Sequence, residues 1–308
     1  MNKRENQQPA ASVSPPAELL PAHKLHPRQF QGTSLVYPVI SRRSRGFSVG
    51  INLSPSQQCN FNCLYCQIHR QRPVSSTPAL VPPPNPAFSG QLLEKELTMV
   101  LETILAGEIF QYDPFQDVPP HLRRLNDIAF SGDGEPTASP NFLETVRLCA
   151  RIKDQMALTS VKLLLITNST LLGEPQVVEG LRVLDRHQGE IWAKLDAGTE
   201  AYYQEVNRGS IPFAEILDNL RAAGRRRPII IQTLFMKIDG RPPADAEIDA
   251  YISRLNDLRA AGTQISAIHL HTVARPPADI RAGALAPDEL GRLAQRIAER
   301  VALPVQKY

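Results

Sequence analysis

Three cysteines in one short loop are the strongest indication of chemistry in this chain. Cys59, Cys63 and Cys66 follow the spacing Cys-x3-Cys-x2-Cys. Three thiolates this close can hold three corners of an iron–sulfur cube, and the loop supplies no cysteine for the fourth corner. One iron would therefore keep an open coordination site for a small molecule. The spacing predicts a catalytic cluster.

A structural zinc knuckle is the alternative interpretation of the same loop, with His69 as the fourth ligand. It fits less well, because the loop follows an apolar stretch at 47–53 that predicts a strand, whereas zinc knuckles are usually small closed modules. The fourth cysteine, Cys149, lies in an apolar helical pattern where a buried thiol is expected. Disulfides are disfavoured for the same reason.

The elements that must position this loop alternate along the chain. Short apolar runs are separated by stretches with helical periodicity, such as the one from Leu92 to Leu105. The apolar runs lie at 51–53, 128–130, 161–166, 191–195, 229–235 and 268–273. Alternating strands and helices predict a parallel sheet covered by helices, here an α/β fold that forms a partial (β/α)6 barrel. In such barrels the chemistry gathers at the carboxyl ends of the strands.

Polar groups stand at the ends of the second and third predicted strands. Gly132 and Gly134 allow a tight turn that exposes backbone groups to a ligand, and the carboxylate of Glu135 could take an ammonium group. Thr167 and Asn168 end the third strand, where they are either a helix cap or ligand contacts.

The later strands carry polar side chains on one face. Alternation puts Lys194 and Asp196 on the same face as Trp192, and this face is expected to point into the barrel. A buried Lys and Asp there must pair with each other or with a ligand. His269 and His271 share one face of the last strand, which favours substrate binding or proton handling.

The cysteine motif, with the aromatic Tyr65 before its last cysteine, resembles the signature of the radical S-adenosylmethionine (radical SAM) superfamily. The resemblance implies a [4Fe–4S] cluster that splits SAM into methionine and a 5′-deoxyadenosyl radical. It also implies that Gly132, Gly134 and Glu135 bind the amino group of SAM, although an Asp separates the two glycines here. Thr167, Asn168 and Gln232 are expected as further cofactor neighbours.

A narrower resemblance rests on Leu-Asp-Ala-Gly at 195–198 and Asn-Arg at 207–208. These segments resemble radical SAM proteins of the wybutosine-synthase-like group. The resemblance implies that Asp196 lies near the SAM ribose or the substrate. Arg208 either pairs with the SAM carboxylate or is a solvated surface arginine. Partners implied by the family are an external electron donor, such as a flavodoxin or ferredoxin, and a substrate for which tRNA is one candidate.

The length and composition of the chain limit its possible domain organisation. The 308 residues, 42% of them hydrophobic, suit one large domain, and no apolar run approaches the roughly 18 residues of a membrane span. We expect a disordered or loosely docked arm at 1–30, a core domain at 31–280, and a C-terminal helix and tail at 281–308. A cytoplasmic location is expected, because the N-terminus has no apolar signal core and reducing conditions suit a cluster.

The substrate is the least determined part of the function. The net charge of +3 does not demand a nucleic acid. Arginines at 42, 43, 45 and 225–227 precede strands, so we expect them at the barrel bottom, on a solvated surface away from the site. The Pro-rich segment 72–90 is either a lid or a plain surface loop.

Three hypotheses for the function remain open at this stage. The first is modification of an RNA base, which only the family resemblance favours. The second is radical chemistry on a peptide or small metabolite. The third is a non-catalytic, metal-stabilised binding protein. Catalytic roles are assigned to Lys194, Asp196, His269 and His271.

Overall fold

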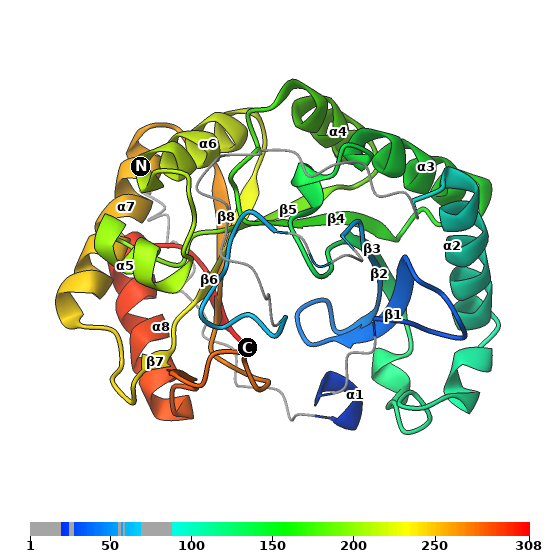
Figure 1. Ribbon diagram of the computed structural model, residues 1–308, viewed down its shortest axis with the longest axis horizontal. Coiled ribbons are helices and arrows are strands. Elements are labelled where there is room, and N and C mark those ends of the chain that lie inside the picture. The colour runs from blue at the N-terminus through cyan, green and yellow to red at the C-terminus, as the bar shows by residue number, and fades with distance from the viewer. Residues whose placement is uncertain (1–19, 25–27, 55–56, 58, 69–87) are drawn as a thin grey trace, which may run out of the picture.

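An open sheet of eight strands curves through the centre of the molecule, with helices on its outer side (Figure 1). The computed structural model describes residues 20–24, 28–54, 57, 59–68 and 88–308. In sheet order the strands are β1 (Val36–Ser41), β2 (Gly46–Ile51), β3 (Leu125–Phe130), β4 (Lys162–Thr167), β5 (Glu190–Lys194), β6 (Ile229–Leu234), β8 (Ile265–His271) and β10 (Val305–Lys307). Only β1 is antiparallel to its neighbour. A small separate pair consists of β7 (Lys237–Ile238) and β9 (Ala282–Gly283).

The helices lie on the convex face of this sheet except for α1, which packs near β1 at the open side of the barrel (Figure 1). They are α1 (Pro21–Lys24), α2 (Gly90–Leu105), α3 (Phe142–Gln155), α4 (Pro175–Arg186), α5 (Glu200–Val206), α6 (Phe213–Arg226), α7 (Asp245–Ala260) and α8 (Pro287–Val301), with 3-10 turns η1 (Glu108–Gln111), η2 (Pro120–Leu122) and η3 (Pro136–Ala138). In α2, Leu93, Leu97 and Leu101 are fully buried, as the apolar periodicity predicted. Ser89 caps its first turn by accepting from the Leu92 N–H.

The predicted partial (β/α)6 barrel is confirmed. Each of the six predicted apolar runs overlaps a parallel strand, namely β2, β3, β4, β5, β6 and β8. The boundaries differ by a few residues. The first of the six predicted strands, β2, ends at Ile51 because Asn52 turns the chain. The Asn52 Oδ1 accepts from the Ser54 N–H (3.1 Å), and its Nδ2 donates to Asp133 (2.9 Å).

Two edge strands extend the barrel beyond the predicted six. β1 forms an antiparallel hairpin with β2, and β10 adds to β8 at the other end of the sheet. β1 precedes the first strand–helix–strand unit, and β10, although it follows α8 and lies parallel to β8, has only three residues, so periodicity did not indicate either strand. Because β1 and β10 do not pair with each other, the barrel remains open between its first and last strands.

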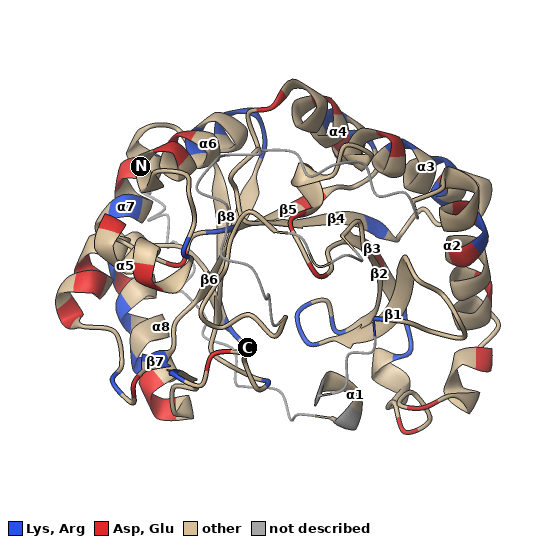
Figure 2. Cartoon of the chain, in the orientation of Figure 1, with Lys and Arg blue, Asp and Glu red and all other residues tan. Residues whose placement is uncertain are grey.

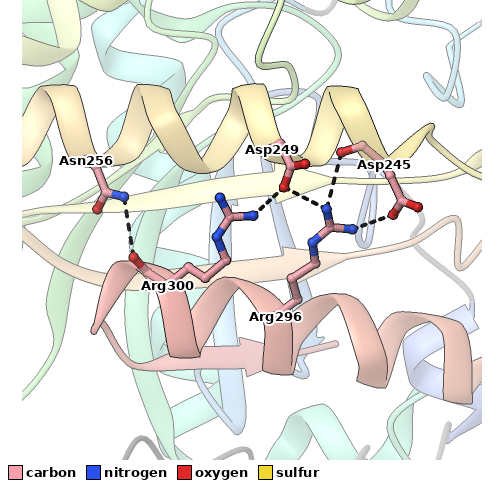
Figure 3. A network of polar contacts seen from close by, with 5 residues as sticks. All are labelled: Asp245, Asp249, Asn256, Arg296 and Arg300. Carbon is pink, nitrogen blue, oxygen red and sulfur yellow. Dashed lines mark hydrogen bonds and ion pairs between the residues drawn. The ribbon is translucent and has the colours of Figure 1, made fainter.

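Charged side chains fix the last helix on its neighbour (Figure 3). Arg296 bridges Asp245 and Asp249 of α7, with 2.6 Å from its Nη2 to the Asp249 Oδ1, and Arg300 donates to the same Asp249 oxygen. Shared carboxylates of this kind orient both helices, although each exposed pair contributes little free energy. The segment after α8 is thereby positioned to enter the sheet as β10.

The chain termini of the described part pack against the core. Ala22 and Phe30 are buried, and Val305 of β10 is inaccessible to solvent. The Pro-rich segment predicted as a lid or surface loop lies, up to residue 87, outside the described residues. None of the described helices is long and apolar enough to cross a membrane.

Candidate active site

A cavity of about 340 Å³ lies inside the barrel, and all three cysteines of the motif line it. The loop that carries them follows β2, so they lie beyond the carboxyl end of a parallel strand, where barrel enzymes place their chemistry. Strand side chains form much of the remaining wall, among them Ala129, Ile166, Trp192, Lys194, Gln232 and His271.

Backbone bonds attach the cysteine loop to two later parts of the chain. The Leu64 N–H donates to the Val206 carbonyl (2.7 Å), and the Cys66 carbonyl accepts from the Ala278 N–H (2.8 Å). The side-chain amide of Asn207 lies 3.7 Å from the Cys63 sulfur. N–H groups directed at thiolates stabilise their negative charge, and burial raises the pKa of the Cys63 thiol, an effect that nearby Lys194 opposes.

Two asparagines join the same loop to the end of β4. Asn168 Nδ2 donates to Asn60 Oδ1 (2.6 Å), and Asn60 Nδ2 donates to the Thr170 hydroxyl (2.7 Å). The Asn168 Oδ1 in turn accepts from the Thr170 N–H (3.2 Å). Of the two open interpretations of Asn168, a cap or a ligand contact, these bonds favour a local structural role, while the side chain still lines the cavity.

Tyr65 connects the two charged residues predicted on β5. Lys194 Nζ donates to the Tyr65 hydroxyl (2.9 Å), which donates to Asp196 Oδ2 (2.5 Å). Asp196 also accepts from Asn207 Nδ2 (2.8 Å) and from the Leu234 N–H (2.8 Å). Lys194 and Asp196 therefore interact through the tyrosine rather than as a direct ion pair.

The pKa values of Tyr65 and Lys194 reflect their burial and their charged neighbours. Burial raises the pKa of Tyr65 well above its ordinary value, and the Asp196 carboxylate adds to the rise. Burial alone would lower the pKa of Lys194, but Asp196 and the cysteine thiols outweigh it and raise the pKa. Lys194 is thus a stable cation facing the cysteine loop.

The turn after β3 has the tight geometry that its glycines predicted. A Cβ at Gly132 would collide with the Asn52 side chain, so only glycine fits there. Glu135 is 3% exposed and lines the cavity. Its carboxylate accepts from the Thr167 hydroxyl (2.7 Å), the Asn168 N–H (2.6 Å) and the Thr137 hydroxyl (2.6 Å).

These bonds tie the ends of β3 and β4 together. Thr167, predicted as a cofactor neighbour, donates to Glu135 and also lines the cavity. Burial raises the pKa of Glu135, and the N–H and O–H donors around it oppose that rise. A buried carboxylate held in this way is pre-oriented for a cation.

The remaining predicted residues are spread around the cavity. Gln232 lines it and accepts from Arg43 Nη1 (3.1 Å). His271 lines it as well, whereas His269 is buried behind the wall, edge-on to the Trp192 ring at 4.9 Å. Arg208 does not line the cavity, since it pairs with Asp279 (2.7 Å). Its role toward SAM stays a prediction.

The expectation of a solvated surface away from the site is wrong for three of the arginines before strands, and one of them is Arg42, which is half-buried and lines the cavity. Arg43 turns inward from the β1–β2 turn, where it lines the cavity and stacks on Trp192 at 4.5 Å from the ring centroid. Arg227 is 9% exposed and pairs with Asp185 (2.7 Å). The antiparallel hairpin of β1 and β2 was not predicted, and the turn of this hairpin places Arg43 at the lower end of the barrel.

Sequence reasoning also missed several cavity residues. Arg28, Arg42 and Arg275 line the cavity, and Arg28 pairs with Asp133 (3.1 Å) in the glycine turn. Asn207 was noted only as part of a family segment. An Asn-Arg pair shortly after a strand is a weak signal, because its contact with Cys63 depends on how α5 packs.

The cysteine loop has two candidate occupants, an iron–sulfur cluster and a single zinc ion. Among the described residues, no three His, Cys, Asp or Glu side chains are placed to hold one metal ion. A zinc ion needs its ligands within about 2.0–2.3 Å of one point, whereas each thiolate of a [4Fe–4S] cluster binds a different iron. His69, the fourth zinc ligand in the alternative interpretation, lies outside the described residues.

An open parallel barrel with a three-cysteine loop after its first parallel strand is typical of a class of enzymes that use a metal cofactor. The model of the radical SAM superfamily matches residues 53–250, and the chain belongs to that superfamily. This confirms the family resemblance.

The chain is also similar to proteins whose names give only a family, UPF0026. A UPF0026 protein of Helicobacter pylori (strain ATCC 700392 / 26695) is 25% identical over 263 residues, which are 82% of this chain and 70% of that protein. A UPF0026 protein of Methanocaldococcus jannaschii is 27% identical over 56% of this chain and 43% of its own length. A crystal structure of archaeal TYW1 aligns with 82% of this chain and 72% of that chain, at 16% identity and a TM-score of 0.47.

Proposed function

We propose that this protein binds a [4Fe–4S] cluster through Cys59, Cys63 and Cys66 and cleaves SAM reductively. The observation that carries the proposal is the common cavity of the three thiols and Glu135. When bound, the cluster supplies the electron that splits SAM into methionine and a 5′-deoxyadenosyl radical. Superfamily membership supports this chemistry.

Residues of the chain itself bind and orient SAM and set the charge around the thiolates. Glu135 receives the ammonium of SAM beside the backbone of Gly132 and Gly134, because its carboxylate is buried and already oriented. Lys194 offsets the negative charge of the three thiolates, and Tyr65 keeps its ammonium in place. Asn207 directs an N–H at the Cys63 sulfur.

Hydrogen abstraction needs a substrate next to the SAM ribose. Asp196 is assigned to that neighbourhood, although it is buried beside Tyr65 and does not itself line the cavity. His271 is assigned to the substrate side of the cavity, and His269 packs behind the wall on the same Tyr308 ring as His271. Modification of an RNA base is the favoured reaction because of the Leu-Asp-Ala-Gly and Asn-Arg segments. A peptide or small metabolite is the alternative substrate, and an external electron donor completes the system.

Anaerobic reconstitution followed by reduction in the presence of SAM tests the proposal. We expect about four irons and four sulfides per chain and slow release of 5′-deoxyadenosine without substrate. His271→Ala should retain this uncoupled cleavage, since it lies on the substrate side. Glu135→Ala should lose most of it at low SAM concentration.

Addition of total RNA, or of a metabolite extract, should accelerate the cleavage in the pool that contains the substrate. Stoichiometric zinc without iron would refute the cluster. A full cluster that never yields 5′-deoxyadenosine under any reductant would refute catalysis and leave a metal-stabilised binding protein.

A further inference from the structure

The open side of the barrel carries a concentration of positive charge. β1 and β10 form the two ends of the sheet, and the turn from β1 to β2 contributes Arg42 and Arg43 to the cavity. Arg275 lines it from the segment after β8. Figure 2 shows the blue segment of the β1–β2 turn directed toward the end of the chain. We call Arg42, Arg43, Arg275 and His271 the seam site.

Cations outnumber carboxylates around this cavity. Among the described residues, its lining contains four arginines and one lysine but only two carboxylates, Asp133 and Glu135. Asp133 is paired with Arg28 at 3.1 Å, and Glu135 is bonded to the end of β4. Neither of these contacts involves Arg42 or Arg43, the two arginines of the β1–β2 turn. The cavity favours a ligand with negative charge.

The contacts of the two turn arginines leave donors for such a ligand. Arg43 bonds the neutral amide of Gln232 (3.1 Å) and stacks on Trp192. The carboxylate of Asp127 attracts the Arg43 guanidinium group. This carboxylate already accepts a hydrogen bond from the Ser48 hydroxyl, and burial raises the pKa of Asp127. Arg42 is half-buried and makes no hydrogen bond or ion pair with any residue of the described ranges.

His271 supplies a second, independent sign of a ligand. It is 7% exposed and lines the cavity, yet its Nε2 is buried without a hydrogen-bond partner among the described residues. Tyr308, which β10 delivers to this point, stacks on the imidazole at 5.1 Å. Burial and the neighbouring arginines lower the pKa of His271 well below its ordinary value. A neutral imidazole with one unsatisfied nitrogen needs a partner.

We infer that the seam site binds a phosphate group of the substrate, with the guanidinium groups of Arg42, Arg43 and Arg275 around it and the unpartnered Nε2 of His271 facing it. Calling this ligand the substrate rests on the proposed function. Several forked donors suit a group with more than one charge and several acceptor oxygens better than a single carboxylate. The phosphate could belong to a small phosphate ester or to a nucleic-acid backbone, which share this chemistry.

The competing occupant is the carboxylate of SAM. The glycine turn and Glu135, assigned to SAM, lie at the ends of β3 and β4, whereas the seam lies between β1 and β10. SAM and phosphate should therefore bind together. If SAM displaced phosphate competitively, the seam site would belong to the cofactor and the inference would be overturned.

Trp192 provides a direct readout, because it is the chain's only tryptophan and stacks on Arg43. Inorganic phosphate titrated into the full chain, before any cluster is reconstituted, should change its fluorescence saturably. Acetate at equal ionic strength should bind far more weakly. Since no cluster is needed, this result stands apart from success or failure of SAM cleavage.

Arg42→Gln and Arg275→Gln should each weaken phosphate binding by about 10- to 100-fold. Arg42→Lys keeps the charge but loses the fork, and it should fall in between. Arg45→Gln is the matched control, because Arg45 is exposed in the same turn and outside the cavity, and it should shift the affinity less than about 2-fold. Urea unfolding of each variant verifies that the fold is intact.

Two further titrants identify the source of the phosphate. Ribose 5-phosphate represents a small ester, and a short RNA without terminal phosphate represents a backbone. Tighter binding of either one, lost in Arg42→Gln, supports the inference and assigns the source. An unsaturable response to phosphate, equal affinity for acetate, or the same loss in Arg45→Gln as in Arg42→Gln would overturn it.

Discussion

The Tyr65 hydroxyl donates to the Asp196 carboxylate at 2.5 Å, which joins the cysteine loop to the strand that carries Lys194. The aromatic residue before the last cysteine therefore has a structural task. It holds a cation near the thiolates and a carboxylate near the predicted SAM ribose. Loss of the hydroxyl should disturb both sides of the site.

Tyr65→Phe should lower the free energy of unfolding by about 1.5–3 kcal/mol, because two hydrogen bonds to charged groups are lost in a half-buried site. It should also make the reconstituted cluster lose iron faster under chelation. Urea denaturation and iron release measure these effects. Tyr112→Phe is the control, since the Tyr112 hydroxyl makes no hydrogen bond within the described residues. Equal behaviour of the two variants would contradict a role for the Tyr65 bridge.

Single replacement of Cys59, Cys63 or Cys66 by Ala should abolish the intact cluster, because each thiolate binds a separate iron. Iron and sulfide content with the visible absorbance band provide the measurement. Cys149→Ala should keep the cluster and cost only about 1 kcal/mol of stability, as expected for a small buried side chain in α3. A cluster that depends on Cys149 would show that the ligand assignment is wrong.

Glu135→Gln should raise the dissociation constant of SAM by about 10- to 100-fold, because it removes the charge from the contact to the ammonium group. Equilibrium binding to the reconstituted protein tests this. Glu96→Gln is a matched control: Glu96 is a buried carboxylate that accepts from the Leu35 and Val36 N–H groups, away from the cavity. It should destabilise the fold and leave SAM affinity unchanged. If both variants weaken SAM equally, Glu135 acts only through stability.

The two histidines buried in β8 should make the fold sensitive to acid. Burial lowers the pKa of His269 to about 3 and that of His271 well below its ordinary value. In acid, the unfolded chain therefore binds a proton at each of these two imidazoles that the folded chain does not bind. Their contribution to stability is complete above about pH 6.5 and is lost as the pH falls, at about 1.4 kcal/mol per pH unit for each histidine.

His271→Asn should remove one such contribution, so that its free energy of unfolding falls less steeply than that of the wild type between about pH 6 and pH 5. Chemical denaturation in phosphate-free buffer measures the slopes. The exposed His121→Asn serves as control and should retain the wild-type slope. An unchanged slope in His271→Asn would mean that this imidazole is protonated in the folded state.

Local patterns determined much of the fold and the metal motif. Strand and helix periodicity depends on neighbouring residues, so it located the six parallel strands and α2. Alternation correctly directed Trp192 and Lys194 into the cavity but not Asp196, which follows the end of β5 and does not line it, and Cys149 is buried as its helical pattern predicted. Three cysteines in one loop form a motif that needs no distant partner.

Contacts between distant segments were decided only by the tertiary structure. Tyr65 meets Asp196 across 131 positions, and Arg43 meets Gln232 across 189. Arg208 pairs with Asp279, which no local pattern connects to it. Such pairs depend on how the barrel closes and on which hairpin lies beneath it. The sequence by itself therefore determined the family, whereas the charge of the seam arose only when β1 and β10 became the two ends of one sheet.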